Sequence, residues 1–290
     1  MAVIYNTQYV DEKYLPIVEP NLYYDSVLQP GVTFTNKYEE RSGGIFIHKL
    51  GSGGLLDPTT PAGDFTDEVT ATTLIQAVFN NTFRKSEIIY GVTAASVAYN
   101  KAEAELSRII REVSESWQVS GLAAMVYEAT ESADTGEITV ENIKAKVVAH
   151  RKALKDSKAN PNFLLCSTDT FATLLNFAGS EFIPMKNDQM TTTGQAGMWY
   201  GFTVIEANAF GEDEAKFYDY QGEVRTVDLT EVDFVMGDYE AFSALNNFEL
   251  VRIIDSERRA GALAQVETNA AYRVTNNDRI IVKKTATASI

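Results

Sequence analysis

The sequence predicts an α+β fold for this chain of 290 residues. Three regions carry the prediction. An amphipathic helical pattern runs over about residues 95–129, short helices and strands alternate over 139–208, and the last third of the chain has the alternating pattern of strands. No internal repeat is visible at any fixed period.

The composition is that of a globular protein, which we expect to be made and kept in a cytoplasm. Apolar residues make up 45% of the chain, and no apolar run is long enough for a membrane span. The start, MAVIYNTQYVDEKY, lacks the basic and apolar regions of a secretory signal. The net charge of -15 argues against a sequence-reading nucleic-acid protein, which would show a basic face.

The first 40 residues predict an extended arm. Pro16, Pro20 and Pro30 prevent a long helix, although a short helical turn fits residues 21–28. An arm cannot bury its many tyrosines by itself. It must therefore lie across its own subunit or across a neighbouring one.

Two strands are predicted next, over residues 43–50 and 69–79. The segment between them, GSGGLLDPTTPAGDFTDE, is rich in Gly, Pro, Asp and Thr and is too long for a tight turn. The pair should form a long two-stranded projection. An isolated hairpin is marginally stable in water, so we expect it to lie on a partner.

The helix over 95–129 would be about 50 Å long if unbroken. Gly121 is the point at which it could bend or end. Its apolar face consists of Tyr99, Ala102, Leu106, Ile110, Val113, Trp117 and Ala124.

The central region predicts a mixed layer of helices and strands. NFLLCS fits a buried strand, TDTFATLLNFA a helix capped by Thr168 or Asp169, and GFTVIEAN another strand. Before them comes a helix with Thr139 as its N-cap and one apolar stripe made of Ile143, Val147, His150 and Leu154.

The last third is predicted to be mostly strand, in the segments KFYDYQGEVRTVDL, VDFVMGDYEAFSAL, FELVRIIDS and NDRIIVKK. Residues 261–272 interrupt this pattern with a composition that indicates a helical or irregular patch.

No catalytic, cofactor-binding or metal-binding constellation emerges from the sequence. Gly194, Gly197 and Gly201 precede a strand, whereas phosphate-binding glycines follow a strand and open a helix. Cys166 lies in an apolar run, which favours a buried thiol, and His150 lies on an apolar stripe, which favours a hydrogen-bonded structural role.

A basic cluster lies on and just after the helix that contains His150. It favours a solvated face, and the alternative is a surface that neutralises an acidic edge of an adjacent copy. Its members are Lys144, Lys146, Arg151, Lys152, Lys155 and Lys158.

The order of these parts resembles the major capsid proteins of tailed double-stranded DNA bacteriophages, which have the Hong Kong 97 capsid fold. Three segments carry the resemblance: TLIQAVFNNTFRKSEIIYG leading into AYNKAEAELSRIIREV, NFLLCSTDTFATLLNF followed by GMWYGFTVIEANAF, and FVMGDYEAFSALNNFELVRIIDSE followed by NAAYRVTNNDRIIVKK. It covers nearly the whole chain.

The resemblance implies a division of the chain into the parts of that fold. These are an N-terminal arm at 1–40, an extended two-stranded loop at 41–85, a peripheral domain with a spine helix at 86–135 and 246–290, and an axial domain at 136–245.

The implied function is self-assembly, through pentamers and hexamers, into an icosahedral shell around double-stranded DNA that is bound without sequence specificity. The resemblance also implies residence in the virion, production in a bacterial host, and a portal. A separate scaffold protein is expected because Met1 leads directly into the arm. Two alternatives stay open: an encapsulin-like shell of a bacterial nanocompartment, and an α/β hydrolytic enzyme that uses the loop of residues 194–201.

The candidate residues for contacts between subunits come from the arm, the extended loop, the long helix and the glycine-rich loop. They are Tyr9, Tyr14, Tyr23, Tyr24, Leu55, Leu56, Phe65, Trp117, Gly194 and Gly197.

Overall fold

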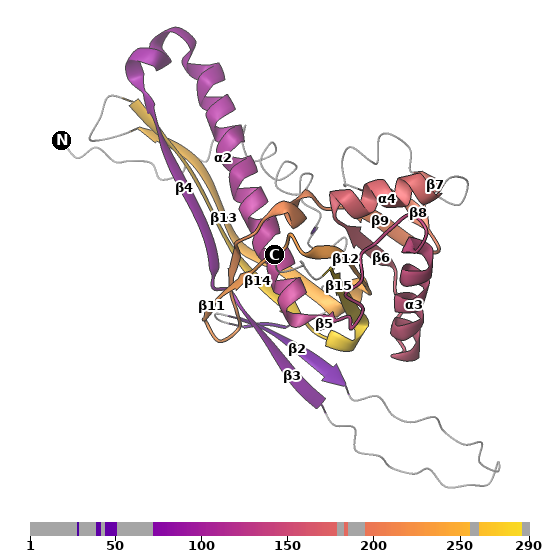
Figure 1. Cartoon of the computed structure of the whole chain (residues 1–290). Helices are drawn as coiled ribbons and strands as arrows, with labels where there is room; N and C mark the ends of the chain where they lie inside the picture. Colours follow the sequence, from indigo (N-terminus) through magenta and orange to yellow (C-terminus); the bar gives the residue numbers. More distant parts are fainter. Residues whose placement is uncertain are drawn as a thin grey trace.

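A computed structural model describes residue 28 and residues 39–41, 44–50, 72–178, 183–184, 195–255 and 261–285. One long helix, α2 (Gly91–Glu128), runs along a three-stranded antiparallel sheet in which the strand order is β13-β14-β4 (Figure 1). The strands are β4 (Asn81–Tyr90), β13 (Phe242–Asp255) and β14 (Gly261–Val274).

Helix α2 confirms the predicted long helix and extends it by four residues at the N-terminal end, from residue 95 to residue 91. The predicted apolar face is buried wherever its side chains are described, at Leu106, Ile110, Val113, Trp117 and Ala124. The helix continues through Gly121 without ending there.

Trp117 belongs to the interior of the subunit. Its side chain is 4% exposed, its Nε1 donates a hydrogen bond of 2.6 Å to Asn246 Oδ1, and its ring centroid lies 5.9 Å from that of Tyr272. Tyr272 in turn donates from its hydroxyl to the carbonyl oxygen of Trp117 at 2.8 Å. This corrects the choice of Trp117 as an intersubunit contact: an apolar helix face predicts burial but does not show whether the partners lie in the same chain.

The two-stranded projection is confirmed and gains a third strand. β2 (Gly44–Leu50) pairs antiparallel with β3 (Thr72–Val78), from Gly44 opposite Val78 to Leu50 opposite Thr72, and β1 (Glu39–Arg41) pairs with β2. At the base of the projection, Ile47 and Ala77 join a buried cluster with Leu245 and Ala271.

A seven-stranded sheet forms the second body of the subunit, in the order β5-β15-β12-β6-β9-β8-β7. β6 and β9 are parallel, as are β15 and β5, and the remaining neighbours are antiparallel. The strands are β5 (Thr130–Glu131), β6 (Phe163–Cys166), β7 (Ile183–Pro184), β8 (Gln195–Trp199), β9 (Phe202–Glu206), β12 (Val232–Gly237) and β15 (Ile280–Lys284).

Both faces of this sheet are covered. Leu164 and Cys166 pack with α3 (Ile143–Asp156) and α4 (Thr168–Ala178), while Phe163 and Leu165 alternate to the opposite face and join the cluster of α2 residues 122–126. Helix α2 therefore contacts both sheets. Three 3-10 helices, η1 (Asn208–Gly211), η2 (Tyr239–Ala241) and η3 (Asn277–Arg279), and a hairpin of β10 (Ala215–Tyr218) and β11 (Val224–Val227) complete the described part.

Residues 261–274 form strand β14, so the predicted helical or irregular patch is wrong. β14 pairs with β13 from Ala262 to Val274 on one side and with β4 from Gly261 to Ala270 on the other, and these two ladders override its local preferences. Strand β15 joins the seven-stranded sheet beside β12, whereas the sequence-based division grouped residues 280–284 with the spine helix.

The predicted caps are also corrected. The N-cap of α3 is Asn142, whose Oδ1 accepts from the backbone N–H of Thr139 at 2.8 Å, so Thr139 begins the preceding turn. At α4 the hydroxyl of Ser167 accepts from the backbone N–H of Thr170, a role predicted for Thr168 or Asp169.

Replacing Trp117 with Ala should lower the free energy of unfolding of the unassembled subunit by about 3–5 kcal/mol, because it empties a buried ring site. Trp117→Phe keeps one aromatic ring but loses the bond to Asn246 and part of the buried indole volume, so its effect should be smaller, about 1–2 kcal/mol. Chemical denaturation of the two variants and the parent measures both; equal stability of parent and Trp117→Ala would contradict the burial.

Candidate functional surfaces

Cys166 and His150, the two side chains considered for a chemical role, both have structural surroundings. Cys166 is buried, and desolvation, with Glu206 adding to the effect, raises the pKa of its thiol far above the usual range. His150 contacts the carbonyl oxygen of Lys146 through Nδ1 and the hydroxyl of Ser132 through Nε2, both at 2.7 Å. This confirms the predicted hydrogen-bonded role.

Among the described residues, no group of three or more His, Cys, Asp and Glu side chains is placed to hold a metal ion. No helix of the described part is both long and apolar enough to cross a membrane.

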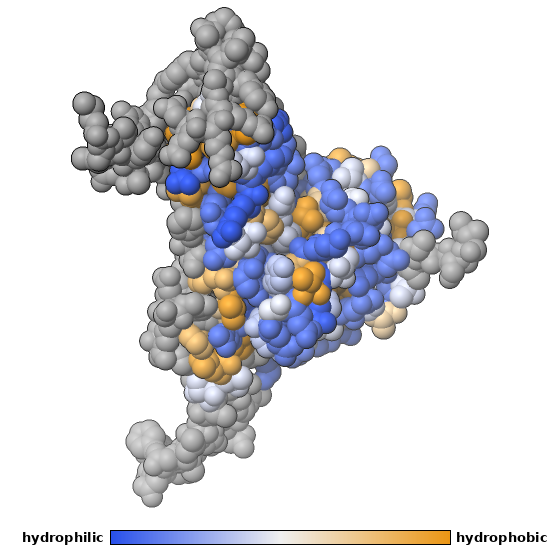
Figure 2. Space-filling model, turned by 90° about the vertical axis from the view of Figure 1, so that its left-hand side faces the viewer, coloured by the Kyte–Doolittle hydropathy of each residue, from blue (hydrophilic) through white to orange (hydrophobic). Residues whose placement is uncertain are grey.

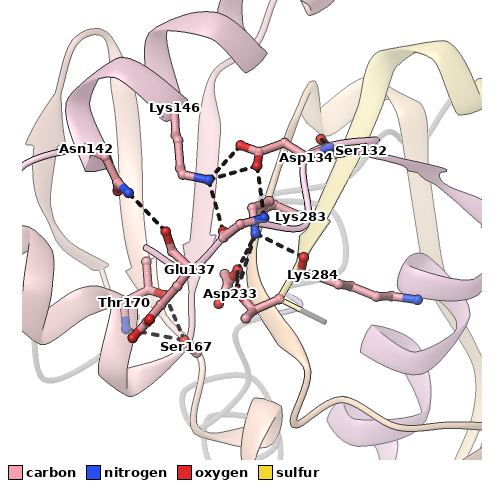
Figure 3. A network of polar contacts seen from close by, with 12 residues as sticks. Ser132, Asp134, Glu137, Asn142, Lys146, Ser167, Thr170, Asp233, Lys283 and Lys284 are labelled. Atoms are coloured by element: carbon pink, nitrogen blue, oxygen red, sulfur yellow. Dashed lines mark hydrogen bonds and ion pairs between the residues drawn. The ribbon is translucent and has the colours of Figure 1, made fainter. Parts of the chain in front are cut away.

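A network of buried and half-buried charges joins α3 to the seven-stranded sheet (Figure 3). Lys146 reaches from α3 to both carboxylate oxygens of Asp134 at 2.8 Å and to the carbonyl oxygen of Gly136 at 2.9 Å. The hydrogen bond from Lys146, supported by the N–H of Gly136 and the charge of Lys283, lowers the pKa of Asp134.

Lys283 lies at the centre of this network with a side chain that is 0% exposed. Its Nζ donates to Asp233 Oδ2 at 2.8 Å and to the carbonyl oxygen of Lys284 at 2.9 Å. Thr285 donates to the same carboxylate oxygen at 2.6 Å. A buried cation is tolerated here because its donors have partners, and the result is a fixed joint between β12 and β15.

The β10–β11 hairpin and the end of α2 carry four exposed apolar side chains, which we call the hairpin surface: Tyr127, Tyr218, Tyr220 and Val224. Tyr127 lies on the side of the hairpin that carries Phe217 and Arg225, whereas Tyr218 and Val224 point to the other side. The guanidinium of Arg225 lies 5.7 Å from the ring centroid of Tyr127, and that of Arg273 lies 4.1 Å from that of Tyr220. On the face drawn in Figure 2, hydrophobic residues form separate patches within a mostly hydrophilic surface.

The hairpin surface is anchored through polar contacts. The side chain of Asn81 accepts from the N–H of Tyr218 at 2.8 Å and donates to its carbonyl oxygen at 3.1 Å. Burial opposes ionisation of Asp219, yet bonds from the N–H of Glu223, from Arg225 and from the N–H of Gln221 together lower its pKa. The candidate list drawn from the sequence missed these residues, although the outward positions of the alternating segment KFYDYQGEVRTV carry the signal.

The turn between β8 and β9 replaces the expected glycine-rich loop around Gly197. Gly197 lies within β8, buried and opposite Val204, which corrects its choice as a residue of an exposed loop and as an intersubunit contact. Tyr200 and Gly201 have φ values of 49° and 82°, as a tight hairpin turn of two residues requires.

Other exposed apolar side chains of this body are Val148 of α3, Leu175 of α4, Met198 of β8 and Tyr200. Lys144 lies over the rings of Tyr200 and Phe177 at 5.4 and 5.9 Å.

The predicted basic cluster is partly tied within the subunit. Besides Lys144 and Lys146, Arg151 lies 5.6 Å from the ring centroid of Phe202, and Lys155 donates to Asn160 at 3.0 Å. Lys152 and Lys158 are exposed. A solvated face for Lys152 and Lys158 stays a prediction, with contact to an adjacent copy as its alternative.

The other candidate contact residues lie outside the described part of the chain. They are Tyr9, Tyr14, Tyr23, Tyr24, Leu55, Leu56, Phe65 and Gly194.

Comparison with solved structures identifies the class of fold. The chain matches one in the capsid structure of the cyanophage P-SCSP1u with a TM-score of 0.65 and 8% identity, covering 88% of this chain and 87% of that one. The mature capsid of bacteriophage PhiM1 matches with a TM-score of 0.60 and 11% identity, covering 85% and 83%. The capsid of a native GTA particle matches with a TM-score of 0.54 and 11% identity, covering 86% of both chains.

No protein-family model matches the chain, and the search of curated proteins found no match to its sequence. The likeness is therefore one of fold: the chain has the fold found in these phage capsid structures. This confirms the predicted α+β class and the capsid fold inferred from the order of the elements.

Replacing Lys283 with Ala should lower the free energy of unfolding by about 3 kcal/mol, because Asp233 then loses its buried counter-charge. Lys284→Ala is the matched control. Lys284 pairs with the exposed Glu131, so its loss should cost about 0.5 kcal/mol or less. Thermal and chemical unfolding of both variants measure the difference. Equal losses of stability would show that the buried pair contributes no more than the exposed one.

Proposed function

We propose that this chain is a major capsid protein, a structural subunit that assembles with copies of itself into an icosahedral shell enclosing double-stranded DNA. The observation that carries the proposal is the match to the cyanophage capsid structure over 88% of the chain at a TM-score of 0.65. The matched structures named above are phage and GTA capsids, and nothing in them favours the nanocompartment or hydrolase alternatives.

The shape of the subunit supports this proposal. A body built on α2 and its sheet, a second body built on the seven-stranded sheet, and a projecting β2–β3 pair give an extended molecule with much surface for its mass (Figure 1). An extended molecule of this kind suits contacts with several neighbours. The role is structural and involves no catalysis.

The parts are assigned as follows in the proposal. Residues 1–40 are the arm and 41–85 the extended loop. The peripheral domain comprises 86–135 and 246–290, and the axial domain comprises 136–245; β5 and β15 of the peripheral segments pair into the seven-stranded sheet. Contacts between subunits involve the arm and loop residues Tyr9, Tyr14, Tyr23, Tyr24, Leu55, Leu56, Phe65 and, near the axial domain, Gly194.

The shell consists of pentamers and hexamers, resides in the virion and is made in the cytoplasm of a bacterial host. A separate scaffold protein and a portal are its partners. The charge of -15 fits DNA that is enclosed without being bound by sequence, because an acidic wall repels phosphate groups.

Negative-stain microscopy and size-exclusion chromatography of the expressed protein test the function. Closed shells of uniform diameter and megadalton mass are expected. A monomer or small oligomer under all assembly conditions would reject the capsid role. The contents distinguish the two kinds of shell, because DNA and a portal vertex define a virus whereas enclosed enzymes define a compartment.

Deleting residues 52–66 should block or strongly weaken shell formation and leave the subunit folded. The β2–β3 ladder ends at Leu50 opposite Thr72, so the deletion spares its paired residues. Circular dichroism and thermal unfolding check the fold, and sedimentation measures assembly. Normal shells from the deletion variant would show that the loop tip makes no necessary contact between subunits.

A further inference from the structure

Leu28 is the one described residue before β1, and it is fully buried. It belongs to the same core cluster as Trp117 and Tyr272, between α2 and β14. A residue of the N-terminal segment therefore occupies the interior of its own subunit.

Gly121 provides the space that Leu28 fills. A Cβ atom at residue 121 would lie 2.4 Å from Leu28 Cδ1 and 2.8 Å from Tyr272 Cε1, both closer than real contacts allow. Its φ is not among the positive values that require glycine, and glycine weakens a helix interior. Glycine at position 121 therefore serves to leave room for the side chain of Leu28.

The walls of this site are held by bonds that do not involve the side chain of Leu28. Tyr272 donates to the carbonyl oxygen of Trp117, and Trp117 donates to Asn246 on β13. We call the space bordered by Trp117, Gly121 and Tyr272 the socket. It is built by α2 and the three-stranded sheet and is apolar where Leu28 enters.

We propose that the socket is the anchoring site of Leu28 from the same chain, in the free subunit and in the shell. The N-terminal segment is then fixed at residue 28 on its own long helix, and only the residues before it are free to reach other copies. The part concerning the shell rests on the proposed function.

The length of chain between two fixed points argues for attachment within one chain. Glu39 is held in β1 by pairing with β2, and the eleven residue-to-residue steps from Leu28 to Glu39 span at most about 40 Å. A tether this short raises the effective concentration of Leu28 at its own socket well above that of a neighbour's Leu28.

A Leu28→Cys/Gly121→Cys double variant tests the attachment. The native Cys166 is buried with a raised pKa and should stay unreactive, and each single variant is a control. After oxidation, the free subunit and the assembled shells should both give a monomeric, internally linked band on a non-reducing gel. Disulfide-linked dimers in the shells would show exchange between copies, and no link in either state would show that Leu28 does not occupy the socket; either result overturns the proposal.

Proteolysis gives a second test that does not require the cysteine pair to fold. Leu28→Asp should speed cleavage within residues 20–38 of the free subunit roughly tenfold, while Leu28→Met should change it by less than about twofold. Gly121→Ala should act like Leu28→Asp. Gly211→Ala is its control, because a Cβ there meets nothing within 4 Å.

Equal cleavage rates in Leu28→Asp and Leu28→Met would overturn the proposal. Both tests on the free subunit are independent of shell formation. An internal link in a protein that never forms shells would reject the capsid function and leave the anchoring site in place.

Discussion

The burial of α2 against two sheets is the constraint on which the rest of the structure depends. Leu106, Ile109 and Val113 pack with Ala264 and Val266 of β14, while residues 122–126 pack with the seven-stranded sheet. One helix of 38 residues thus sets the relative position of both bodies. Because the helix is held on two sides by apolar packing, its stability comes from tertiary contacts more than from local propensity.

Hydrogen bonds and ion pairs of polar side chains fix the relative positions of neighbouring helices and strands, which apolar packing alone does not determine. Asn246 receives the indole N–H of Trp117, and Lys283 and Lys146 hold the carboxylates of Asp233 and Asp134 beside β12, β15 and α3. On the outer side of α2, Lys85 and Arg108 bridge Glu87 and Glu112 and connect β4 to the helix. Buried hydrogen bonds tolerate few alternative partners, so they select one register among several with equal apolar burial.

Sequence patterns predicted elements well where one periodicity dominated, as in α2, α3, α4 and β6. They failed at β14, where the run GALAQVETNAAY favours a helix and pairing with β13 and β4 on both sides makes it a strand.

The pattern at Trp117 indicated burial but could not distinguish burial within the chain from burial between chains. Gly197 was misplaced because a glycine in a strand and a glycine in a loop look alike without the partner strand. The candidate surfaces were the least predictable part, since Tyr127 meets Phe217 and Arg225 only when the hairpin packs against α2.

Charge constrains how identical copies with a net charge of -15 can approach one another, because like surfaces repel. The cations beside the hairpin surface are paired within the subunit. Arg225 binds Asp219 at 2.8 Å while it stacks on Tyr127, and Arg273 binds Glu128 while it stacks on Tyr220. Burial raises the pKa of Glu128, and the N–H of Val274 and the charge of Arg273 oppose that shift. The rings of Tyr127 and Tyr220 therefore each lie beside an Arg–carboxylate pair whose opposite charges largely cancel.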